Sequence, residues 1–162
     1  MSALTLLSLV LAGAALGLMF IPRWPAAAVA YVAMFAGYMG ATSERLVISG
    51  SNLFTWGCAA AIVLALSFVP GRRPRGSAHL YPTLGAIAGV AVGFVSAPTS
   101  AAMVMGSAIG TLLGALAFVR TPAGRGLSVL SRPFLDYACA TGLPAVVAAV
   151  TIALTVVQGF NY

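Results

Sequence analysis

Few residues of this chain carry groups that could do chemistry, and these residues are scattered. Asp136 is the only aspartate, Glu44 the only glutamate and His79 the only histidine among 162 residues. A metal site needs three or four ligands, and acid–base catalysis needs titratable groups close to one another. The sequence has no phosphate-binding loop and no nucleophile beside a base. We therefore expect no catalytic residue, no metal, no cofactor and no enzymatic activity.

Asp136 is the first candidate polar site, because it opens the last apolar stretch of the chain. An ionisable side chain inside a membrane is often functional, for example as a proton or cation site. A carboxylate at the start of a helix is also a common N-cap, here at the membrane interface and paired with Arg132. The position at the end of the stretch favours the cap, and the ionisable site is the alternative.

Thr99 and Ser100 form the second candidate polar site, in a break between two apolar stretches. If the surrounding hairpin enters the membrane only part of the way, its turn must line water or be buried in protein. The turn would then be part of a pore or a substrate site. If both legs cross the membrane, the turn is an outer loop, and this second interpretation is the one we favour.

The composition indicates an integral membrane protein of one domain, residues 1–162. Hydrophobic residues make up 61% of the chain and charged residues 6%, whereas soluble domains carry about 25% charged residues. The mean hydropathy is +1.06 and the isoelectric point about 10.2. All eight basic residues are arginines, and arginines between apolar stretches set membrane topology. We therefore expect the lipid bilayer, and no nucleic acid, as a partner.

Six apolar stretches follow one another along the chain. They cover approximately residues 4–21, 26–41, 53–69, 80–97, 101–119 and 136–157. Crossing a bilayer takes about 20 helical residues, with roughly 17 as the lower limit. The second and fourth stretches are close to that limit. The sequence predicts an all-α integral membrane protein with about six transmembrane helices, in which the fourth and fifth form a hairpin that is spanning or re-entrant.

The arginines predict the orientation of these helices. With six crossings, seven arginines lie on one side of the membrane and only Arg45 on the other. Such a bias marks the cytoplasmic side of a bacterial inner membrane, so both termini are predicted outside. Six of the arginines are assigned to topology or to lipid headgroups: Arg72, Arg73, Arg75, Arg120, Arg125 and Arg132.

Two glycine stripes with a period of four predict how the fourth and fifth helices pack. Small residues let two helices approach closely in lipid, where apolar burial gives no driving force. The numbers mirror one another about the turn at Thr99 and Ser100, so each glycine is expected at the depth of a mate. The pairs are Gly85 with Gly114, Gly89 with Gly110, and Gly93 with Gly106.

Polar and sulfur-containing residues within the apolar stretches have structural interpretations. Cys58 and Cys139 fall near opposite ends of the predicted bundle, too far apart for a disulfide, and are expected to pack as small apolar residues. Thr151 and Thr155, like Thr141, are expected to bond their own helix backbone. Pro144 is expected to kink the last helix.

The order of these features resembles a bacterial membrane family catalogued as domain of unknown function 456. The resemblance rests on two N-terminal stretches joined by Pro22-Arg23-Trp24-Pro25, and on a third stretch followed by a basic loop. It rests also on the double stripe Gly85, Gly89, Gly93 and Gly106, Gly110, Gly114, followed by a last span. The resemblance implies a small multi-span inner-membrane protein and no established reaction.

Two functions fit these observations. The first is a helix-packing scaffold or partner subunit of a membrane assembly, with other membrane subunits or further copies of the chain as partners. The alternative is a small oligomeric transporter or channel. Because the apolar stretches are poor in charge, its solute would be weakly charged or lipid-like. A cavity that reaches Asp136 or the turn at Thr99 and Ser100 would favour the transporter or channel.

Overall fold

The computed structural model describes residues 3–21, 25–41, 48–68, 76–129 and 131–160. Every regular element in these ranges is a helix, and none of them is a strand. The elements are α1 (Ala3–Leu18), α2 (Ala26–Gly40), α3 (Gly50–Ser67), the short 3-10 helix η2 (Gly76–His79), α4 (Leu80–Ser96), α5 (Ser100–Val119) and α6 (Arg132–Phe160). The six predicted helices are therefore present, and five have bounds within three residues of those expected.

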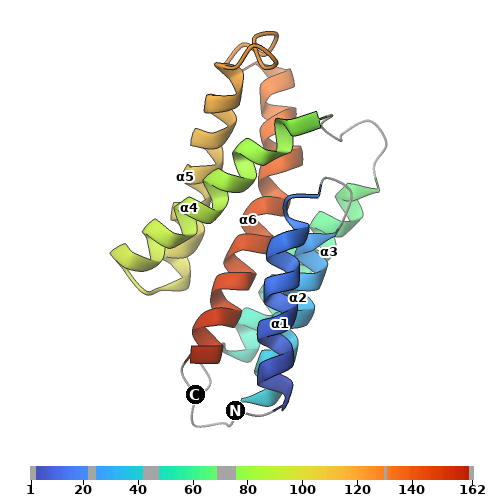
Figure 1. The fold of residues 1–162 in the computed structure, drawn as a ribbon, viewed down its shortest axis with the longest axis vertical. Coiled ribbons are helices and arrows are strands. Elements are labelled where there is room, and N and C mark those ends of the chain that lie inside the picture. Colours follow the sequence, from blue (N-terminus) through green and yellow to red (C-terminus); the bar gives the residue numbers. More distant parts are fainter. Residues whose placement is uncertain (1–2, 22–24, 42–47, 69–75, 130, 161–162) are drawn as a thin grey trace.

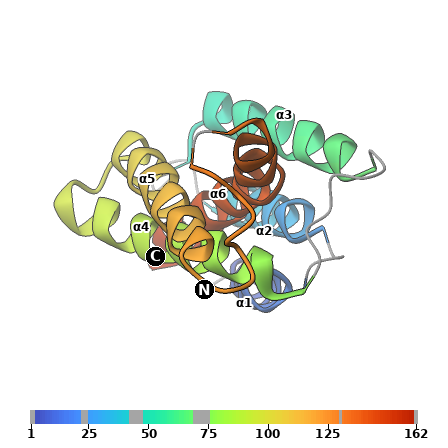
Figure 2. The same cartoon turned by 90° about the horizontal axis from the view of Figure 1, so that it is seen from above.

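Helix α6 is the centre of the fold and packs against all five other α-helices. Two helical hairpins, α1–α2 and α4–α5, lie against it, and α3 covers a further part of its surface (Figures 1 and 2). Successive helices run in opposite directions along the long axis. The end of α5 and the starts of α4 and α6 lie in the upper part of Figure 1, and the ends of α1 and α3 lie near mid-height. Helix α1 begins and α6 ends at the lower end.

Three helices, α3, α5 and α6, are long and apolar enough to cross a membrane. Helices α1, α2 and α4 are apolar but shorter, with 16, 15 and 17 residues. The described chain is thus an all-helical protein with helices that could span a membrane.

The first turn of α6 differs from the prediction. The helix begins at Arg132, four residues before Asp136. The Ser131 hydroxyl oxygen accepts a hydrogen bond from the backbone N–H of Phe134 at 3.3 Å, which is the geometry of an N-cap. Pro133 is tolerated because the first N–H groups of a helix have no partner within it. The expectation that Asp136 caps the helix is wrong, because its backbone is already inside the helix.

Helices α4 and α5 approach so closely that a Cβ atom on any of the six stripe glycines would overlap the backbone of the facing helix. A Cβ on Gly85 would meet the carbonyl oxygen of Gly110, and one on Gly89 the carbonyl oxygen of Gly106. A Cβ on Gly110 would lie 3.0 Å from the Cα of Gly89. Gly85, Gly106 and Gly110 are therefore each seated against glycines of two successive turns of the facing helix.

The closest backbone contacts between these two helices are offset from the predicted pairs. Gly114 lies against Tyr81 and Pro82, and Gly93 lies against Ala102 and Met103. The predicted mates are nevertheless neighbours: a Cβ on Gly106 would lie 3.1 Å from the Cα of Gly93, and one on Gly85 would lie 3.3 Å from the backbone nitrogen of Gly114. The atom nearest to each Cβ position is a carbonyl oxygen of the residue one helical turn away from the predicted mate. The cause is geometric: a Cβ position points towards the N-terminus of its own helix, so antiparallel stripes interdigitate instead of meeting residue for residue.

The last turns of α6 contain a buried polar residue that the sequence did not single out. Gln158 is 1% exposed, and its Oε1 atom accepts a hydrogen bond from the backbone N–H of Ile48 at 3.1 Å. This bond ties the segment before α3 to the end of α6. Two sequence features pointed to it: Gln158 is the only glutamine of the chain, and it continues the helix face of Thr151 and Thr155.

Candidate functional site

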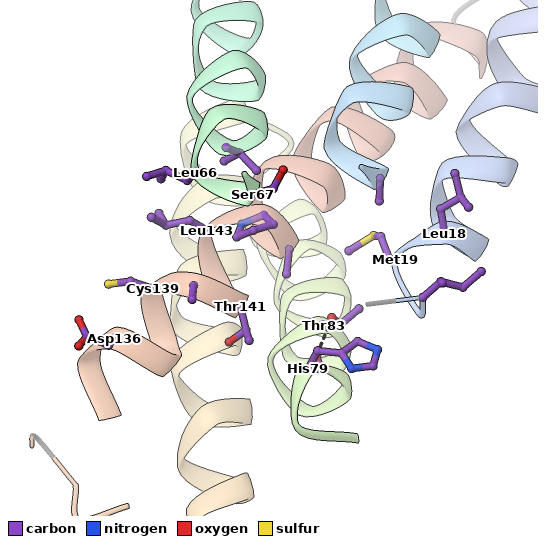
Figure 3. Close-up of a pocket in the computed structure, with 16 residues that line it drawn as sticks. Leu18, Met19, Leu66, Ser67, His79, Thr83, Asp136, Cys139, Thr141 and Leu143 are labelled. Carbon is purple, nitrogen blue, oxygen red and sulfur yellow. Dashed lines mark hydrogen bonds between the residues drawn. The ribbon is translucent and has the colours of Figure 1, made fainter. Parts of the chain in front are cut away.

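A cavity of about 370 Å³ lies beside the first half of α6, against the adjoining ends of α1, α2, α3 and α4 (Figure 3). Its wall is mostly aliphatic, with a few polar groups, and both its size and its composition are typical of small-ligand sites. The apolar lining residues are Leu18, Met19, Ile21, Ala26, Val63, Leu66, Ala140, Leu143, Pro144 and Ala145. The other lining residues are Ser67, His79, Thr83, Asp136, Cys139 and Thr141.

Asp136 belongs to the side of the cavity that is formed by α6 and α3. In Figure 3, Asp136 and Cys139 extend from α6 to the same side, and Leu66 and Leu143 lie on that side as well. Residues 136, 139, 140 and 143 share one face of the helix. Asp136 is exposed, and among the residues that the structure describes its carboxylate has neither a hydrogen bond nor an ion pair, not even with Arg132 one turn earlier. The carboxylate is therefore free to receive a ligand.

Pro144 removes one helical hydrogen bond at the wall of the cavity. A proline inside a helix has no N–H to donate to the carbonyl four residues earlier. In α6 that carbonyl belongs to Ala140, and both Ala140 and Pro144 line the cavity. The carbonyl of Ala140 thus lacks its usual helical donor where the cavity touches the helix.

The polar groups on the other side of the cavity are already used within the fold. The Thr83 hydroxyl donates to the His79 carbonyl at 2.8 Å, and the Thr141 hydroxyl donates to the Tyr137 carbonyl at 2.7 Å. Nε2 of His79 lies 2.9 Å from the Phe20 carbonyl oxygen. A carbonyl only accepts, so Nε2 donates, and the histidine ties the start of α4 to the chain just after α1.

Aromatic side chains hold the first turns of α6 in place. The Tyr137 hydroxyl donates to the Ala78 carbonyl at 2.5 Å. Its ring centroid lies 5.2 Å from that of Phe118, which in turn lies 5.6 Å from that of Tyr81. Such ring pairs stabilise packing beyond the area they bury. The α6 wall of the cavity is therefore fixed to α4 and α5.

The turn at Thr99 and Ser100 is not part of this cavity. The Thr99 hydroxyl accepts a hydrogen bond from the backbone N–H of Ala102 at 3.3 Å and so caps α5. Of the two predicted polar sites, the cavity includes Asp136 and leaves out the turn.

The other predicted residues lie outside the cavity or outside the described part of the chain. Arg120, Arg125 and Arg132 are exposed, and none of them lines the cavity. Arg72, Arg73 and Arg75, like Glu44 and Arg45, fall outside the described residues. Within the described ranges, no three His, Cys, Asp or Glu side chains come together as a metal site would require.

Both cysteines are free, as expected, but both are exposed, so the prediction that they are packed inside is wrong. The reason is that α3 and α6 turn apolar faces outwards, and the cysteines belong to those faces. The threonines behave as predicted: Thr151 donates to the carbonyl of Val147 at 2.7 Å, and Thr155 to that of Thr151 at 2.8 Å.

Two buried hydroxyls on α5 were not anticipated. Ser107 and Thr111 are 0% and 4% exposed, and neither side-chain oxygen has a partner within the described residues. They are one turn apart on the same helix face, and the Thr111 methyl group lies 2.6 Å from where a Cβ on Gly142 would stand. Thr111 lies at the contact with α6, Ser107 lies beside Gly89 of α4, and neither residue lines the cavity.

Comparisons with protein-family models, with curated proteins and with solved structures give no match for this chain. The resemblance to domain of unknown function 456 therefore stays a prediction from the sequence.

Proposed function

We propose that this chain is a multi-pass bacterial inner-membrane protein that binds a weakly charged or lipid-like solute in the cavity beside α6, as a small transporter or channel. The observation that carries the proposal is that the cavity reaches Asp136, whose carboxylate is neither a helix cap nor paired within the described chain. An unpaired carboxylate beside a ligand-sized, mostly apolar cavity is typical of a binding site.

The alternating directions of the helices support a membrane placement with six helices in the bilayer. Arg120, Arg125 and Arg132 follow α5 or open α6, at the end of the molecule to which the cavity belongs. By the positive-inside rule that end is cytoplasmic, and both termini lie outside. The cavity would therefore open near the cytoplasmic leaflet.

The tight hairpin of α4 and α5 would act as the packing device of this bundle. The glycines bring the two backbones into direct contact, which is a principal source of helix association in lipid. In Figure 1 the turn of this hairpin lies near the middle of the long axis, whereas α1 begins at the lower end. Helix α5 is long and apolar enough to cross the bilayer, which supports a crossing by both legs, with a re-entrant hairpin as the alternative.

A second candidate function is a scaffold or partner subunit, and the exposed face of α3 favours it. Only 11% of the candidate span in α3 is buried within the chain. Phe54, Ile62 and Phe68 are 74%, 60% and 75% exposed. Lipid would cover these side chains in a monomer, and another subunit or a second copy would cover them in an assembly.

Cysteine labelling from the two sides of the membrane tests the topology. Single cysteines are introduced as Gly76→Cys and Asn161→Cys in a protein carrying Cys58→Ser and Cys139→Ser. We expect an impermeant maleimide to label position 161 in intact cells and position 76 only after permeabilisation. Labelling of position 76 from the periplasm would contradict the orientation.

Alkylation of Cys139 tests the cavity as a binding site, because this exposed thiol lines it. The protein carries Cys58→Ser and is reconstituted in nanodiscs. We expect amphiphiles, including a neutral one such as dodecyl maltoside, to slow the reaction of Cys139 with N-ethylmaleimide. The matched control is a Cys139→Ser protein, in which Cys58 is the remaining thiol. Cys58 lies away from the cavity, so amphiphiles should leave its reaction rate unchanged. If amphiphiles slow both thiols equally or neither, the proposed site is wrong.

A further inference from the structure

We infer that the solute of this cavity is an amphiphilic cation: an ammonium group held at Asp136 and an apolar body that lies between α3 and α6. This inference rests on the proposed function and names the ligand class for the same site. Three features of the cavity lead to it: the sign of its charge, the kind of hydrogen-bonding group it leaves unpaired, and the character of its wall.

The charge of the described lining favours a cation. Asp136 is its only acidic residue, and none of the described arginines lines the cavity. His79 is the only basic side chain in the lining, and its Nε2–H is directed to the Phe20 carbonyl. Among the described lining residues, an anionic headgroup would meet a carboxylate and no arginine, whereas a cation would neutralise the carboxylate.

The unpaired groups are hydrogen-bond acceptors. The carboxylate of Asp136 and the carbonyl of Ala140, which lacks its usual helical donor because of Pro144, belong to residues one turn apart on the same face of α6. The lining hydroxyls of Thr83 and Thr141 already donate hydrogen bonds to backbone carbonyls. A ligand that donates hydrogen bonds, as an ammonium with N–H groups does, complements these acceptors.

The wall next to Asp136 fits an apolar body. Leu66 of α3 and Leu143 of α6 lie on the same side of α6 as the carboxylate (Figure 3), and Val63 lies one turn before Leu66. Leu66 and Leu143 are 37% and 47% exposed, so this side of the cavity opens on the surface that would face lipid. A ligand could enter from the bilayer with its charged end at the carboxylate.

The test compares headgroups on one alkyl chain. The protein with Cys58→Ser is placed in phosphatidylglycerol nanodiscs, and Cys139 alkylation is followed with dodecylammonium, dodecyl maltoside and dodecyl sulfate. We expect dodecylammonium to protect Cys139 at concentrations at least roughly tenfold lower than the neutral detergent, with dodecyl sulfate the weakest. The cation is enriched in the anionic bilayer. The alkylation rate of Cys58, measured in the Cys139→Ser protein with the same amphiphiles, corrects for this enrichment.

Variants of Asp136 decide whether the carboxylate is responsible. Asp136→Asn should abolish the preference for dodecylammonium and keep protection by dodecyl maltoside, while Asp136→Glu should keep the preference. Protection by the neutral detergent without any preference for the cation would overturn this inference and leave the proposed function standing. A preference that survives Asp136→Asn would also overturn it. No protection by any amphiphile would overturn both.

A second arm distinguishes the source of the ammonium. In nanodiscs containing phosphatidylethanolamine, occupation by the lipid headgroup would slow Cys139 alkylation without added amine, and Asp136→Asn would restore the rate. Protection only by added dodecylammonium would identify a free amphiphilic amine as the ligand. Either result supports an ammonium ligand, and the absence of both contradicts it.

Discussion

The two halves of α6 use their polar groups differently. In the second half, the hydroxyls of Thr151 and Thr155 and the side chain of Gln158 are fully buried, and each has a hydrogen-bond partner. In the first half, Asp136 is exposed without a partner in the described chain, and Pro144 leaves the Ala140 carbonyl without its helical donor.

This difference separates the part of α6 that holds the fold together from the part that can receive a ligand. A buried polar group in a helix bundle stabilises the fold only when its hydrogen bonds are made. Polar groups that keep unused acceptors beside a cavity contribute little to stability and are available for binding. We therefore expect substitutions in the two halves to affect different measurements.

The largest effect is expected from Gly89→Leu, which breaks the hairpin that packs against α6. A side chain at Gly89 would overlap the carbonyl of Gly106, so α4 and α5 must separate. We expect a loss of about 3 kcal/mol in the free energy of unfolding, measured by denaturation in mixed micelles, together with faster alkylation of Cys139.

Gly13→Leu is the matched control for this substitution. No neighbouring atom lies within 4 Å of a Cβ placed on Gly13, although Gly13 and Gly17 repeat the same four-residue spacing. We expect its free energy of unfolding to stay near that of the unmodified protein. An equal loss in both variants would show that the close contact of α4 and α5 is not what holds the first half of α6.

An intermediate effect is expected from Gln158→Met in the second half of α6. Methionine has a similar length but cannot accept the hydrogen bond, so the backbone N–H of Ile48 is left buried and unpaired. We expect the free energy of unfolding, measured by the same denaturation, to fall by about 2 kcal/mol. The affinity of the cavity for amphiphiles should stay unchanged. Asp136→Asn, its counterpart in the first half, should change stability by less than about 0.5 kcal/mol. A larger loss of stability in Asp136→Asn than in Gln158→Met would contradict the different roles of the two halves of α6.

The smallest effect, and one of opposite sign, is expected from Pro144→Ala. Alanine restores an N–H that can donate to the Ala140 carbonyl. We expect a gain of up to about 1 kcal/mol in stability, together with weaker protection of Cys139 by dodecylammonium. A gain in stability with unchanged protection of Cys139 would show that the Ala140 carbonyl is not part of the binding site. Asp136 would then be the acceptor of the ligand.

Most helix bounds could be predicted from the sequence, because proline, glycine and polar segments interrupt the apolar stretches. The start of α6 could not, since Ser131 and Asp136 are both good caps and only the fold shows which one faces the first N–H groups. The glycine stripes predicted which faces of α4 and α5 meet, while their register depends on the direction of the Cβ positions.

The cavity could be predicted only in part. Asp136 was a candidate because charge is rare in this chain. Leu18, Val63 and Thr83, which also line the cavity, come from three other helices and carry no local pattern that relates them to Asp136. Bringing helix ends together is a property of the packed bundle, so no reading of single stretches could have found the cavity.

The most direct test of a ligand site in the first half of α6 is photoaffinity labelling with a diazirine-bearing alkylammonium, followed by peptide mapping. We expect labelled residues at 63–67 of α3 and 139–145 of α6, with labelling prevented by excess dodecylammonium and strongly reduced in Asp136→Asn. Labelling spread evenly over the outer faces of the helices, or concentrated in the second half of α6, would contradict the account.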